Sequence, residues 1–142
     1  MDFTDLLKNS LAVVTGGYVT AHDDLIGVID RVRKALLSNA GEQVALELKK
    51  VSADVSSTVF RLFLDPSTMD PETALVTITY FRLPSSGYPI EWGSYKRVTN
   101  TFEASGEAEV KEELEKFFGS LLTQPESTLV QAIGFAMRQG KT

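Results

Sequence analysis

The spacing of apolar residues changes twice along this 142-residue chain, and the two changes define the fold class. Apolar residues recur every three or four positions up to about residue 40 and again after residue 105, which is typical of helices with one buried face. Between these segments they alternate with polar residues, which is typical of strands. Strands grouped together with helices at both ends indicate an α+β fold, with helices packed on an antiparallel sheet.

The predicted order of elements is α-α-β-β-β-β-α-α. Helices are expected at 3–15, 21–38, 106–122 and 125–138, and strands at 43–49, 57–65, 74–83 and 89–99. We expect Gly16-Gly17 to end the first helix, Ser105 to cap the third, and the Thr123–Glu126 segment to act as a capping box for the last. Short links containing Asp, Pro or Gly favour hairpins, so the sheet is predicted to be a four-stranded antiparallel meander.

The last two predicted strands are the most apolar and aromatic part of the chain. The strand at 74–83 is apolar on both faces, which predicts a central position in the sheet. The strand at 89–99 contains Gly93, and a glycine within a strand often marks a bulge. Such a bulge would place Trp92 and Tyr95 on the same face of the sheet.

Length, cysteine content and charge exclude several classes of protein. We expect one domain over residues 1–142. The absence of cysteine excludes disulfides, thiol nucleophiles and cysteine-ligated metal sites. The net charge of −5 disfavours a nucleic-acid partner. Asp2 and Asp5 precede the first lysine, unlike the basic start of a signal peptide, and no apolar run approaches a membrane span, so a cytoplasmic protein without a membrane partner is expected.

No catalytic residue, metal ligand or cofactor is predicted. His22 stands beside Asp23 and Asp24, which outlines a base with an orienting carboxylate, but no nucleophile lies nearby and an exposed helix start is the simpler interpretation. Gly16-Gly17 lacks the lysine of a phosphate-binding loop. The acids near residue 70 do not match an EF-hand and are interpreted as ordinary turn residues: Asp65, Asp70 and Glu72.

Two segments are candidate recognition surfaces. Residues 80–97 carry three basic residues against one acid, a local charge of +2 on an acidic chain, together with the aromatic residues that often anchor interfaces. The alternative for this segment is ordinary strand packing. The last predicted helix has few polar residues and is apolar on more than one side. The candidate partner-binding residues are Arg82, Tyr88, Trp92, Tyr95, Arg97 and Phe135.

The first functional hypothesis is a non-enzymatic protein-interaction or assembly module, in the manner of an adaptor, a chaperone or an immunity protein. Its partner would be another protein or a second copy, giving a homo-oligomer. The second hypothesis is a small-molecule-binding domain with an apolar pocket between the sheet and the helix at 106–122, lined by Tyr80, Trp92 and Phe117. An enzyme that uses only carboxylates, tyrosine or lysine is the third.

Overall fold

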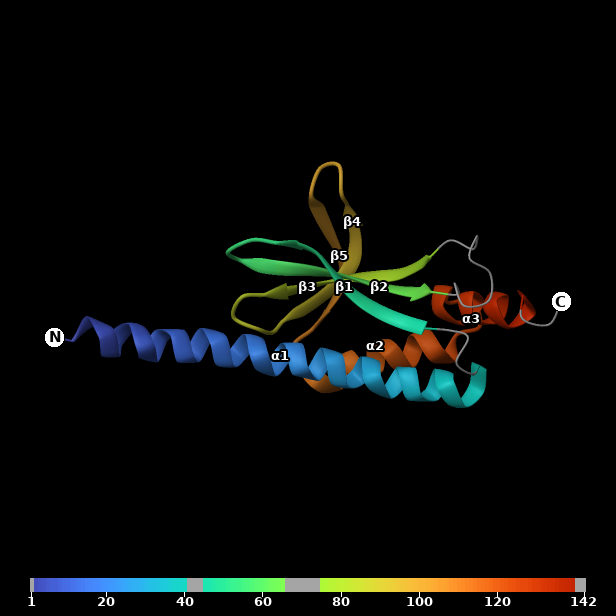
Figure 1. Cartoon of the computed structure of the whole chain (residues 1–142), viewed down its shortest axis with the longest axis horizontal. Coiled ribbons are helices and arrows are strands. Elements are labelled where there is room, and N and C mark those ends of the chain that lie inside the picture. Colours follow the sequence, from blue (N-terminus) through green and yellow to red (C-terminus); the bar gives the residue numbers. More distant parts are fainter. Residues whose placement is uncertain (1, 41–44, 66–74, 140–142) are drawn as a thin grey trace.

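A computed structural model describes residues 2–40, 45–65 and 75–139 of the chain as an antiparallel sheet with a long N-terminal helix and two C-terminal helices (Figure 1). The elements in order are α1 (Phe3–Ala40), β1 (Ala45–Ala53), β2 (Ser57–Asp65), β3 (Val76–Pro84), β4 (Ile90–Lys96), β5 (Thr101–Ala108), α2 (Lys111–Thr123) and α3 (Thr128–Gln139). The predicted strand positions 43, 44 and 74, and the acids Asp70 and Glu72, lie outside the described residues.

The sheet is an antiparallel meander in the order β1-β2-β3-β4-β5. The α+β class, the meander and the central position of the third strand are therefore confirmed, but the predicted number of four strands is wrong. The fifth strand, β5, pairs with β4 and occupies residues predicted as the link after the last strand (101–105) and as the start of a helix (106–108). Asn100 permits the turn between these two strands, because it adopts the left-handed backbone conformation with φ of 52° that Asn tolerates well.

The two predicted N-terminal helices are one helix of 38 residues, so the prediction that Gly16-Gly17 ends a helix is wrong. Glycine costs a helix roughly 1 kcal/mol relative to alanine, which weakens a helix without stopping it. Gly17 has a packing role instead. A Cβ atom there would lie 2.3 Å from the carbonyl oxygen of Ser86, and one on Gly87 would lie 2.3 Å from that of Gly17. The loop between β3 and β4 therefore approaches α1 where α1 has no side chain.

The neighbouring glycines offer a matched pair of substitutions. Gly16→Ala meets no atom within 4 Å, so we expect it to raise the free energy of unfolding by up to about 1 kcal/mol through helix propensity. Gly17→Ala gains the same propensity but collides with backbone, so we expect a net loss of about 1–2 kcal/mol. Urea unfolding followed by circular dichroism measures both. Equal effects of the two variants would contradict the packing role of Gly17.

Both C-terminal helices begin later than predicted. Ser105 lies in β5 and caps nothing; α2 begins at Lys111, with Val110 at the N-cap position. The Thr123–Glu126 segment is not a capping box. The hydroxyl of Ser127 instead accepts a hydrogen bond from the backbone N–H of Val130, at 3.2 Å, in the first turn of α3.

The helices bury one face of the sheet in a single apolar cluster. Phe81, on the central strand β3, is fully buried and contacts Phe117 and Phe118 of α2 at ring-centroid distances of 5.9 and 5.7 Å. The buried face that the apolar spacing predicts for the helix at 21–38 is confirmed in the second half of α1. From α1 the cluster receives Ala21, Leu25, Val28, Ile29, Val32 and Leu36.

No helix of the described residues packs on the opposite face of the sheet, which curls on itself. Register shifts interrupt three of the four strand pairs, at Lys50/Ser52, Leu62/Phe63 and Trp92/Gly93, and such bulges increase strand twist. As a result the end of the β4–β5 hairpin reaches β1, where the hydroxyl of Ser52 lies 3.2 Å from Oδ1 of Asn100.

Candidate functional site

The predicted ligand pocket between sheet and helix is not formed by its three residues. Trp92 and Phe117 stack on each other at 4.2 Å between ring centroids, and both line an open hollow of about 460 Å³ beside α2. Tyr80 lies on the opposite face of the sheet, where its ring contacts Tyr95 at 5.6 Å. Trp92 and Tyr95 therefore face opposite sides, and the prediction that they share a face is wrong. The extra residue of the bulge is Ser105 on β5, so the alternation of β4 is unchanged.

Tyr88 turns toward α1. Its hydroxyl donates a 2.7 Å hydrogen bond to Oδ2 of Asp24, and the side chain is half-buried. Burial, followed by the hydrogen bond to the carboxylate, raises the pKa of Tyr88 above its ordinary value. The phenol thus fastens the β3–β4 loop to the helix, beside the contact between Gly17 and Gly87.

The two arginines among the candidate partner-binding residues, Arg82 and Arg97, differ in their contacts within the chain. Arg82 pairs with Glu91 on the neighbouring strand, and its guanidinium lies 4.9 Å from the ring centroid of Phe102. Its charge is thereby engaged within the chain. Arg97 is exposed in the turn between β4 and β5, and Tyr95 is half-buried. The candidate partner-binding residues of 80–97 are thus divided between the two faces of the sheet and the turn between β4 and β5.

Phe135 and His22 are also accounted for by contacts within the chain. Phe135 on α3 is half-buried, with the guanidinium of Arg138 5.9 Å from its ring centroid. The imidazole of His22 stacks on Tyr18 at 5.9 Å and contacts Phe60 at 6.0 Å. Among the residues that the structure describes, no group of three or more His, Cys, Asp or Glu side chains is arranged to hold a metal ion.

A set of exposed apolar side chains lies on the part of α1 for which the sequence predicts a separate short helix. The first half of α1 extends beyond the sheet and the other helices (Figure 1), and every residue from Asp2 to Gly16 is exposed. At 1.5 Å per residue, this projection is about 20 Å long. Six large apolar side chains cover one side of it, and we call this set the α1 stripe: Phe3, Leu6, Leu7, Leu11, Val13 and Val14.

The α1 stripe continues the buried face of the same helix. Residues at heptad spacing along α1 are apolar from the stripe into the core: Leu7, Leu11, Val14, Tyr18, Ala21, Leu25, Val28 and Val32. From Tyr18 onward this series packs on the sheet and the other helices, whereas Leu7 is 60% and Leu11 53% exposed. One helix face is therefore covered over its second half and uncovered over its first half.

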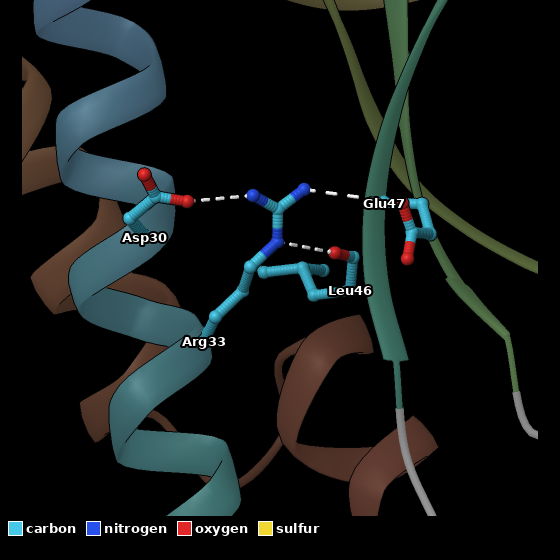
Figure 2. A network of polar contacts seen from close by, with 4 residues as sticks. All are labelled: Asp30, Arg33, Leu46 and Glu47. Carbon is cyan, nitrogen blue, oxygen red and sulfur yellow. Dashed lines mark hydrogen bonds and ion pairs between the residues drawn. The ribbon is translucent and has the colours of Figure 1, made fainter.

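The second half of α1 is fixed in direction by Arg33 (Figure 2). Its Nε donates a 2.8 Å hydrogen bond to the carbonyl oxygen of Leu46 at the edge strand β1. The same guanidinium pairs with Asp30 on the preceding turn at 2.6 Å and approaches Glu47 at 3.9 Å. Because the second half of α1 is held in this way, the projecting half points in a defined direction.

Two hollows border α1. One, of about 250 Å³, lies at the base of the projection between Val14 and Tyr18 on the helix and Asp54, Thr58 and Ser85 on the sheet. The other, of about 270 Å³, lies between α1 and α2. There Arg31 bonds to Glu115 at 2.8 Å, and this hydrogen bond lowers the pKa of the Glu115 carboxyl.

An unsupported helix of this kind is marginal in water. Isolated helices of fewer than about 12–15 residues gain little from propensity, and most helical stability in proteins comes from packing of an apolar face. The projection also contains weak helix formers such as Thr4, Asn9 and Val13. Local support comes from Asp2, whose carboxylate accepts a 2.9 Å hydrogen bond from the N–H of Thr4, and from Asp5 in the first turn. The projection therefore gains most from a partner that covers its apolar side.

The apolar face on the first half of α1 could be predicted from the sequence. The helical spacing of Phe3, Leu6, Leu7, Leu11 and Val14 was sufficient to predict a helix with one apolar face. Periodicity does not show whether the same chain covers that face, and here it does not.

No protein-family model matches the chain, and neither a curated protein nor a solved structure matches it significantly. Over the described residues, no helix has both the length and the apolar character needed to cross a bilayer.

Proposed function

We propose that this protein is a non-enzymatic protein-interaction module and that the α1 stripe is its binding surface. The observation that carries the proposal is the uncovered apolar face of the projection, which continues a face that is buried elsewhere in the same helix. Contiguous apolar patches beyond a few hundred Å² are uncommon on monomers and mark interaction sites. A helix with an apolar face is a recurrent recognition element, since it packs against a groove or against another helix.

The proposal places the binding surface on α1, away from residues 80–97. Arg82, Tyr88 and Trp92 each have a partner within the chain, which makes them poor anchors for another protein. Within the described part of the chain the stripe residues are exposed, which gives them apolar area to bury on binding.

Cross-linking in cells that express the protein naturally tests the proposal. Lys8 is the one lysine between residues 1 and 33, so an amine-reactive reagent reports on the projection through it. We expect cross-links from Lys8 to another polypeptide chain. The double variant Leu7→Glu/Leu11→Glu should lose them, because binding would bury two carboxylates without partners.

Val19→Glu is the matched control. Val19 is 47% exposed on the same helix but lies on the opposite side from the stripe, so its substitution should leave the cross-links in place. A wild-type chain without any intermolecular cross-link from Lys8, or with cross-links that survive in Leu7→Glu/Leu11→Glu, would contradict the proposal.

A further inference from the structure

We infer that the partner of the α1 stripe is the α1 stripe of a second copy of this chain, in an antiparallel helix pair. The inference rests on the proposed function and names its partner. The spacing of the stripe is the first support. Leu7, Leu11 and Val14 follow the alternating four- and three-residue steps of a helix that packs along another helix. This spacing fits a helix as partner better than it fits a strand or a loop.

The charges on the projection favour an identical partner in the antiparallel orientation. Residues 2–20 carry Asp2, Asp5 and Lys8, a net charge of 1 − 2 = −1, on a chain of net charge −5. Such a weakly charged segment offers no attraction for a strongly charged partner and little repulsion toward its own copy. A parallel pair would set each aspartate near its counterpart.

An antiparallel pair avoids that repulsion. With Leu7 opposite Leu11 of the second copy, Asp5 lies level with Val13 and Asp2 with Gly16 of that copy, so the aspartates of the two copies lie more than two helical turns apart. The helix dipoles are also opposed in this orientation, which is favourable. A twofold contact of this kind uses the same surface of both copies and closes after two, so it does not propagate into a fibre.

The area of the stripe is compatible with a specific dimer. All six of its side chains are at least 45% exposed. Two copies together offer close to the roughly 1,000 Å² of total buried surface that a specific interface requires. The hollow at the base of each projection, beside Val14 and Tyr18, leaves room for the end of the other copy's helix.

Sedimentation equilibrium of the purified full chain tests the inference. We expect a mass of twice 15.6 kDa at tens of micromolar. Leu7→Glu/Leu11→Glu should weaken self-association at least tenfold, because the twofold contact brings four new carboxylates together in an apolar interface. Val19→Glu should remain dimeric, and circular dichroism should show that both variants keep their sheet and their remaining helices.

Cysteine cross-linking provides a second measurement that does not depend on charge. The natural chain has no cysteine, so a single introduced thiol reports only on its own position. Ser10 lies within the stripe side of the helix and Ala12 on the opposite side. Under mild oxidation Ser10→Cys should form a covalent dimer, whereas Ala12→Cys should remain largely monomeric.

The outcomes separate this inference from the proposed function. A monomeric chain whose Lys8 cross-links to a different protein would overturn the second-copy inference and leave the proposed function standing. A monomeric chain without a partner would overturn both. A dimer that survives Leu7→Glu/Leu11→Glu, without cross-linking through Ser10→Cys, would place self-association elsewhere and overturn the inference.

Discussion

Replacing Phe81 with alanine is expected to lower the free energy of unfolding by about 3–5 kcal/mol. Phe81 is fully buried on the central strand and contacts both Phe117 and Phe118, so the substitution removes the side chain that joins the sheet to α2. A loss of this size is a large part of the roughly 5–15 kcal/mol by which a typical domain is stable. Urea unfolding measured by circular dichroism gives the value.

Phe102→Ala is the matched control for this substitution. Phe102 is half-buried on the face of the sheet that carries no helix, beneath the guanidinium of Arg82. The same chemical change there loses less buried area, and we expect about 1 kcal/mol. Equal losses in the two variants would show that the helix-covered face is not the principal core.

Replacing Gly93 with alanine is expected to cost about 2–3 kcal/mol, because the strands β4 and β5 pass too close for a side chain at this position. A Cβ atom on Gly93 would lie 1.9 Å from the carbonyl oxygen of Glu103 and 3.0 Å from the Cα atom of Ala104. Both belong to the paired strand, so the hairpin must separate or bend to admit the methyl group.

The single tryptophan reports on the same change. Trp92 precedes Gly93 and stacks on Phe117, so a displaced β4 should expose its indole and shift its emission to longer wavelength. Ser94→Ala, at the exposed next residue, should change stability by less than about 0.5 kcal/mol and leave the emission unchanged. A Gly93→Ala variant with wild-type stability and emission would refute the close approach.

Local sequence patterns were most successful where one face of an element is buried in its own chain. The alternation in 57–65 predicted β2, and the helical spacing of apolar residues in 21–38 predicted the buried side of α1. The strand β5 was missed because its sequence, TFEASGEA, has few apolar residues to alternate. Its extended form comes from backbone pairing with β4, and its two glutamates suit an edge strand exposed to water.

The candidate site was predicted less well than the fold. Aromatic and basic residues are favoured both in strands and at interfaces, so composition could not separate Trp92 as a packing residue from Trp92 as a binding residue. The distinction depends on whether Phe117, 25 positions later, stacks on it. Five of the six residues of the α1 stripe, all except Val13, were recognised as one helix face, but their exposure was not predicted.

Sequence alone therefore determined the class of fold, the meander and the apolar face of the first helix, because these follow from the period of side chains along one element. Tertiary structure decided the use of Gly17, which depends on a loop 69 residues later coming into contact with it. Tertiary structure also determined which part of α1 is buried. The other elements pack on α1 as far as Tyr18, whereas Leu7 and Leu11 are exposed to water. Periodicity creates an apolar face, but only the positions of other elements in space determine whether that face is core or binding surface.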